Sequence, residues 1–283
     1  MKNALLCTHQ GYTDIIICIG MMYYYINHYN LIIIVRKELK DFLESIFKKY
    51  KNIKFFYFPI EKLCPIEVKM KPLIQKLLND KNINIDIFLY CGPALASKHN
   101  GPHEPICNAN YFYNIYSDYR LDKNIAYKYF NIERDVNLEE ERYNKLINSI
   151  GSNYIIINQD DDKINRPRPK YGSNDDLELM GEINSNFFIN KNLPVFNLSK
   201  SSVTIIDMIK IIENAKEIHL TSTFWTLIIY YIQLKYNLFS KIPIFLHSYV
   251  IPSRIYSNLV NSSFDKNMYC EFGSVWKILN KNI

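Results

Sequence analysis

The chain has 283 residues, enough for one large domain or two domains of ordinary size. Its 34 basic and 28 acidic residues are scattered, and a net charge of +6 without a dense basic run does not indicate a nucleic-acid-binding protein. The longest apolar stretch, residues 15–26, is about half of the roughly 20 residues that a membrane span needs. The six cysteines show no CxxC spacing, so we expect a cytoplasmic protein with reduced thiols and no zinc site.

The first half of the chain alternates strands and helices. Residues 31–36 form a β-branched run, which is typical of a parallel strand that is covered on both faces. We expect strands at 3–8, 31–36, 53–58 and 85–91, and helices at 14–28, 37–50 and 68–79. This alternation predicts an α/β fold with a parallel sheet and right-handed crossovers.

A loop rich in Pro, Gly and His begins at Gly92, and the α/β alternation starts again after Gly151. Between them we expect helices at 108–120, 125–131 and 138–149, with Asn137 opening the last. After Gly151 we expect strands at 154–158, 193–198, 217–220 and 242–247, helices at 203–214 and 224–235, and a tail helix at 268–279.

The sequence therefore predicts two Rossmann-like domains, residues 1–150 and 151–283, that face each other across a cleft, with a tail that could cross back onto the first domain. Ligands of open α/β sheets bind beyond the carboxyl ends of the strands, so the candidate site residues are those that follow the strands.

The strand at 217–220 runs into Thr221, Ser222 and Thr223, directly before an apolar helix. Unpaired N–H groups and the positive dipole end make such a helix start suitable for a phosphate, although an ordinary Ser/Thr cap explains the same residues. His247 ends the last expected strand, and it and His219 are candidate donor-binding residues. Because His219 lies inside a strand, a hydrogen-bonded structural histidine is the simpler interpretation of that residue.

Two arginines, Arg166 and Arg168, alternate with prolines in a long polar loop, residues 159–170. Arginine suits bidentate phosphate recognition, and the prolines restrict the backbone. The alternative is a solvated loop in which the carboxylates of residues 160–162 pair with these basic side chains.

In the first domain, the turn His9, Gln10, Gly11 follows the first strand. Gly11 would allow a ligand to approach the backbone. Asp14 could be a helix cap or a general base, and His103, in the later Pro/Gly loop, is a second candidate base whose alternative is an ordinary surface histidine.

Residues 9–20 resemble the start of sugar-nucleotide-dependent glycosyltransferases of the GT-B fold, the heptosyltransferases among them. Residues 207–225 resemble the donor-binding half of such enzymes, including fucosyltransferase-like ones. The resemblance implies Asp14 as base, Gly11 in the turn that lines the cleft, Ser222 and Thr223 on the donor phosphate, and Glu213 near the nucleotide. Arg166 or Arg168 would neutralise the departing nucleoside diphosphate. One departure from the family pattern is that Tyr12 and Thr13 replace Leu-Gly.

We therefore expect a hexosyl- or deoxyhexosyl-transferase that uses a nucleotide-sugar donor and a glycan-type acceptor, with no cofactor. No Asp-x-Asp motif follows a strand in the way that metal-dependent glycosyltransferases show, so no metal is expected. The alternative is a non-catalytic nucleotide- or sugar-binding protein with the same fold. An NAD-dependent oxidoreductase is less favoured, since no Gly-x-Gly-x-x-Gly follows a predicted strand. The donor, the acceptor and the oligomeric state stay open.

Overall fold

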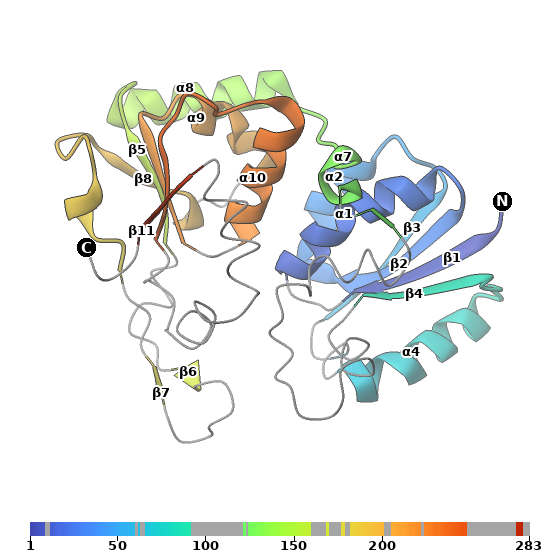
Figure 1. Ribbon diagram of the computed structural model, residues 1–283. Coiled ribbons are helices and arrows are strands. Elements are labelled where there is room, and N and C mark those ends of the chain that lie inside the picture. The colour runs from blue at the N-terminus through green and yellow to red at the C-terminus, as the bar shows by residue number, and fades with distance from the viewer. Residues whose placement is uncertain are drawn as a thin grey trace. The chain divides into compact units, whose positions relative to one another are not determined.

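The structure, a computed structural model, describes residues 1–8, 12–59, 62, 66–91, 121–122, 124–159, 168–169, 177–178, 182–200, 205–221, 224–247 and 276–279 (Figure 1). It divides into two compact units, the first ending at Glu133 and the second beginning at Arg134. That these units face each other across a cleft stays a prediction.

The first unit is built on a parallel four-stranded sheet in the order β3-β2-β1-β4. Its strands are β1 (Asn3–Thr8), β2 (Asn30–Arg36), β3 (Ile53–Phe58) and β4 (Ile87–Cys91). Its helices are α1 (Tyr12–Ile26), η1 (Lys37–Leu39), α2 (Lys40–Phe47), α4 (Ile66–Asp80) and α7 (Ile125–Lys128). The α/β class and the parallel sheet that the sequence predicts are confirmed for this unit.

Apolar residues cover both faces of this sheet. Helices α1 and α2 lie on one face and α4 lies on the other (Figure 1). On the α4 face, Leu5, Cys7, Ile32 and Ile34 are buried against the apolar residues of α4, including those at 73–78. Every residue from 31 to 35 is buried, as expected of a β-branched strand between two helix layers.

Helices α1 and α7 touch at a glycine. A Cβ on Gly20 would lie 2.3 Å from the carbonyl oxygen of Ala126 and 2.4 Å from that of Ile125, so a larger residue does not fit without a backbone shift. Nearby, the rings of Tyr24 and Tyr129 meet edge to face with their centroids 5.4 Å apart.

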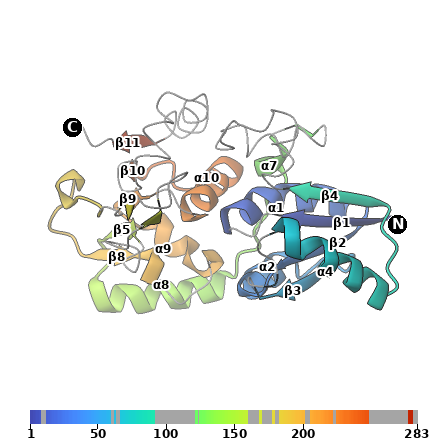
Figure 2. The same ribbon diagram turned by 90° about the horizontal axis from the view of Figure 1, so that it is seen from below.

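The second unit has a parallel five-stranded sheet in the order β11-β10-β9-β5-β8. Its strands are β5 (Ile155–Asn158), β8 (Val195–Asn197), β9 (Glu217–Leu220), β10 (Ile244–His247) and β11 (Lys277–Leu279), and β6 (Arg168–Pro169) and β7 (Leu177–Glu178) form a separate antiparallel pair. Its helices are α8 (Val136–Ile150), η3 (Ser185–Phe187), η4 (Leu198–Lys200), η5 (Ile205–Met208), α9 (Ile209–Glu213) and α10 (Phe224–Tyr236). Helices α9 and α10 lie on the same side of the sheet (Figure 2). Each connects one strand to a later strand nearer β11, and right-handed crossovers that move in the same direction place their helices on one face.

The predicted helix at residues 268–279 is wrong at its end, where the chain forms strand β11. Lys277, Ile278 and Leu279 pair in parallel with the edge of β10. Trp276 is buried, its Nε1 donates a hydrogen bond of 2.6 Å to Oε1 of Gln233, and its ring meets that of Tyr230 edge to face. Pairing with an open strand edge and this contact with α10 override the local apolar pattern. The described part of the tail therefore belongs to the second unit.

Helix α8 belongs to the second unit, whereas we predicted a domain boundary at Gly151. Gly151 instead ends α8: its φ is 85°, and its N–H donates to the carbonyl of Ile147 over 2.8 Å. The helix also begins earlier than predicted, because Asp135 rather than Asn137 is its N-cap. Oδ1 of Asp135 accepts a hydrogen bond from the N–H of Leu138 over 3.1 Å.

None of the helices in the described ranges has the length and apolar character that crossing a membrane requires. Cys7 and Cys18 are buried, and neither forms a disulfide bond with another described residue.

Candidate ligand-binding site

The strand order of the second sheet reverses between β5 and β9. From β5 the chain moves to β8 at one edge, and then returns to the other side of β5 to form β9, β10 and β11 in turn. Asn158 and Leu220 are register partners at the carboxyl ends of these two strands. Ligands of open α/β sheets bind at such a switch point, so the site is expected beyond Asn158 and Leu220.

Thr221 ties this edge together. The side chain is buried, and its Oγ1 donates a hydrogen bond of 3.0 Å to the carbonyl of Asn158, across the switch point. The hydroxyl of Thr226, on α10, donates to the carbonyl of Thr221. Thr221 therefore holds β9, β5 and α10 together. Ser222 and Thr223, between it and the start of α10, lie outside the described residues.

Amide side chains fix the carboxyl ends of β5 and β8. The side chain of Asn197 donates to the carbonyl of Gln159 over 2.7 Å and accepts from its N–H over 3.2 Å. The side chain of Asn158 is fully buried and donates to the hydroxyl of Ser199 over 2.7 Å. We did not predict these residues, although Asn158 at the end of the β-branched run 155–157 was a readable signal.

Two histidines meet inside the second sheet. Nδ1 of His219 and Nε2 of His247 are 2.7 Å apart, and both side chains are fully buried. The His219 ring stacks on Phe245 at 4.7 Å and packs against Phe188 at 4.5 Å. Burial lowers the pKa of His247 to about 4, and burial together with the neighbouring His247 lowers the pKa of His219 to about 3. Both rings are therefore neutral near pH 7.

A buried carboxylate lies beside this pair. Oε2 and Oε1 of Glu217 accept hydrogen bonds from the backbone N–H groups of Ile189 and Asn190 over 2.9 and 3.1 Å. Oε2 of Glu217 is 3.7 Å from Nε2 of His219, which has no hydrogen-bond partner among the described residues. Glu217 was not among the residues predicted for the site, because a Glu at the start of a strand looks like a surface residue in the sequence.

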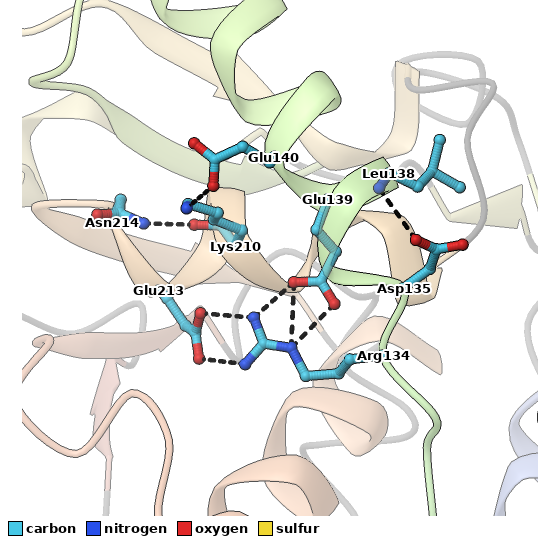
Figure 3. A network of polar contacts seen from close by, with 8 residues as sticks. All are labelled: Arg134, Asp135, Leu138, Glu139, Glu140, Lys210, Glu213 and Asn214. Atoms are coloured by element: carbon cyan, nitrogen blue, oxygen red, sulfur yellow. Dashed lines mark hydrogen bonds and ion pairs between the residues drawn. The ribbon is translucent and has the colours of Figure 1, made fainter.

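Glu213 is held by an arginine (Figure 3). Nη1 and Nη2 of Arg134 donate to its two carboxylate oxygens over 2.7 and 2.8 Å, and Nε of the same guanidinium donates to Glu139 over 2.9 Å. These hydrogen bonds raise the pKa of Arg134 above its ordinary value. The preceding residue, Glu133, pairs instead with Lys49 over 3.0 Å. Arg134 thus joins α8 to α9, and a role of Glu213 near a nucleotide stays a prediction.

The first sheet has its own switch point, between β1 and β4, where Thr8 and Cys91 are register partners. The two predicted loops of this unit, with His9, Gln10 and Gly11 in one and His103 in the other, follow these neighbouring strand ends in the chain and lie outside the described residues. Asp14 is the third residue of α1, which begins two residues earlier than predicted. Its role as a base stays a prediction.

Arg166 lies outside the described residues, and Arg168 lies in β6, where its register partner is Glu178 of β7. This short strand was predicted as loop. Among the described residues, no group of three His, Cys, Asp or Glu side chains is arranged to hold a metal ion, and residues 160–162 lie outside that set.

No protein-family model matches the chain, and no curated protein is similar to it in sequence. Among solved structures, the chain is similar to the E. coli heptosyltransferase WaaC with ADP, at 8% sequence identity and a TM-score of 0.38. The match covers 95% of this chain and 98% of that one. A likeness at this level assigns neither a family nor an activity to the chain.

Proposed function

We propose that the protein is a glycosyltransferase that moves a sugar from a nucleotide-sugar donor to a hydroxyl of a glycan-type acceptor without a metal ion. The observation that carries the proposal is the connection between β9 and α10. It contains Thr221, Ser222 and Thr223, it begins at the switch point of a parallel sheet, and it leads into a helix of 13 residues.

This connection has the chemistry that a diphosphate needs. The first N–H groups of a helix and its dipole attract an anion, and Thr221 fixes the helix start to β5 through Asn158. In the proposed reaction these groups, together with Arg166 or Arg168, stabilise the departing nucleoside diphosphate. Asp14 or His103 in the first unit takes the proton of the acceptor hydroxyl.

The test is a thermal-shift series with nucleoside diphosphates and nucleotide sugars, with and without a chelator. A ligand that binds the native state raises the melting temperature by mass action. We expect one nucleotide to stabilise the protein whether or not the chelator is present. If no nucleotide does so, the proposal fails, and Thr221, Ser222 and Thr223 only cap a helix.

A charge variant separates the cap from the phosphate site. Ser222→Asp keeps a residue that favours a helix start but places a negative charge where the phosphate would bind. We expect unchanged stability without ligand and at least a tenfold loss of nucleotide affinity, about 1.4 kcal/mol. The matched control is Asn137→Asp, which puts the same charge in the first turn of α8 and should leave nucleotide affinity unchanged.

The second candidate is a protein that binds the same nucleotide without transferring a sugar. The replacement of Leu-Gly by Tyr12 and Thr13 favours it. Nucleotide binding in the thermal-shift series, with no donor hydrolysis or transfer across a panel of acceptors, would decide for it. If transfer occurs, Asp14→Asn should abolish turnover and preserve donor binding.

A further inference from the structure

We propose that Glu217, acting through His219, holds His247 in a single tautomer, with Nε2 protonated and Nδ1 a hydrogen-bond acceptor, at the carboxyl edge of the second sheet. Glu217 and His219 are then positioning residues for the ligand site at this edge, a role that rests on the proposed function. The tautomer itself does not depend on that function.

The proton positions follow from the carboxylate. Glu217 uses its oxygens as acceptors toward two backbone N–H groups, so it presents negative charge to Nε2 of His219 at 3.7 Å. A nitrogen lone pair facing that charge would be repelled, whereas an N–H is attracted. Nε2 of His219 therefore carries the proton.

The second step follows from the contact between the rings. With one proton on a neutral ring, Nδ1 of His219 has a lone pair and must accept in the 2.7 Å contact. Nε2 of His247 is the donor in that contact. Because His247 is also neutral and carries its one ring proton on Nε2, its Nδ1 is an acceptor. Any group that meets Nδ1 of His247 therefore donates an N–H or O–H.

Both rings are neutral because of where they lie. They are fully buried, and the His219 ring stacks on Phe245 and packs against Phe188, so a charge on either imidazole would be poorly solvated. The lowered pKa values of both histidines agree with this environment.

The register places His247 beside the switch point. Leu246 pairs with Leu220, so His247, the next residue, lies level with Thr221 on the neighbouring strand. The three polar side chains therefore run from the amino end of β9 to the carboxyl end of β10. The carboxylate of Glu217 thereby sets which kind of hydrogen-bonding group His247 presents at the ligand-binding edge.

The direct test is the side-chain ¹⁵N spectrum of histidine in the intact protein at pH 7.5. We expect His219 and His247 each to show a protonated Nε2 and an unprotonated Nδ1. An Nδ1–H tautomer at His247, or a charged ring at either position, would overturn the proposal.

Glu217→Gln tests the positioning role. The amide removes the negative charge that faces Nε2 of His219, and in either orientation its NH₂ meets one of the two backbone N–H groups that Glu217 binds. We therefore expect the ¹⁵N spectrum of this variant to lose the single Nε2–H tautomer at His219 and His247, with at least a tenfold loss of affinity for the nucleotide that stabilises the wild type. The matched control is Glu141→Gln on the exposed face of α8, which should change neither.

The outcomes separate the two proposals. A changed tautomer at His247 with unchanged nucleotide affinity would overturn the positioning role. If Glu217→Gln does not fold, the wild-type spectrum still decides the tautomer. A wild type that binds no nucleotide contradicts the proposed function, while its spectrum still tests the relay of Glu217, His219 and His247.

Discussion

The central strands of both sheets are buried, but the side chains that they bury differ in chemistry. In the first unit, the central strands β1 and β2 bury aliphatic residues and Cys7. Every polar or charged side chain that is buried among the described residues belongs to the second unit: Glu139, Asn158, Glu217, His219, Thr221, Thr226, Gln233 and His247. Most of these lie in or next to β5, β9 and β10, or on α10.

This difference shows how strictly each sheet determines which side chains can occupy its buried positions. An aliphatic strand is stabilised by burial alone and accepts many side chains of similar volume. A buried polar side chain needs a particular partner, because leaving it unsatisfied costs free energy. The first sheet is therefore a support for its loops, whereas the second sheet fixes individual polar groups at the edge where we place the nucleotide.

The largest effect is expected from placing a polar group in the apolar sheet. Ile33 is fully buried in the centre of β2, and Ile33→Asn removes its apolar burial and leaves an amide without partners. We expect a loss of about 4 kcal/mol in the free energy of unfolding, measured by urea denaturation. Ile33→Val, which keeps the chemistry, should cost about 1 kcal/mol. Similar losses for both variants would show that packing, not polarity, limits this sheet.

The stability of the second sheet, which buries two histidines, should depend on pH. The pKa values of His219 and His247 lie below the ordinary value of 6.5, so the unfolded chain binds protons that the folded chain does not. Their stabilising contribution is complete above pH 6.5 and is lost as the pH falls toward 4 and 3. Each histidine adds at most about 1.4 kcal/mol per pH unit to this loss, about 2.7 for both.

Urea denaturation between pH 7.5 and 4.5 measures this slope. Carboxylates also titrate at the lower end, so the reference is the double variant His219→Gln with His247→Gln, whose stability should depend less on pH. Equal slopes for the wild type and the double variant would contradict the buried neutral pair.

A smaller effect is expected at the charged junction of α8 and α9. Arg134→Lys keeps the charge, but an ammonium group cannot donate in parallel to both Glu139 and Glu213. We expect a loss of about 1 to 2 kcal/mol in the free energy of unfolding. The control is Arg36→Lys, whose Nε pairs with the carboxylate of Glu38 over 3.0 Å, and which should cost less than about 0.5 kcal/mol. An equal cost for the two variants would reduce the Arg134 junction to an ordinary ion pair.

Local patterns in the sequence were sufficient for most of the fold. Short apolar runs placed β1, β2, β3 and β9 within a residue, and the alternation of strands with helices indicated parallel sheets. Strand β11 was missed because its three residues form a strand only by pairing with β10. The boundary at Gly151 was misplaced because a glycine that ends a helix and a glycine in a linker give the same signal.

The polar contacts of the site were less accessible from the sequence. His219 and His247 are 28 residues apart, and only the register of β9 and β10 brings them together. Arg134 and Glu213 are likewise 79 positions apart in the chain, and no local pattern links them. His219 was correctly interpreted as a hydrogen-bonded interior histidine, while its carboxylate neighbour Glu217 required the structure.

The close contact of Gly20 with the carbonyl oxygens of Ile125 and Ala126 has a practical consequence for dissecting the molecule. It means that the first unit is completed by chain far beyond its last strand. A fragment that stops after β4 would leave the α7 side of α1 without its packing partner and open to aggregation. Any recombinant version of this unit should therefore be cloned through Glu133.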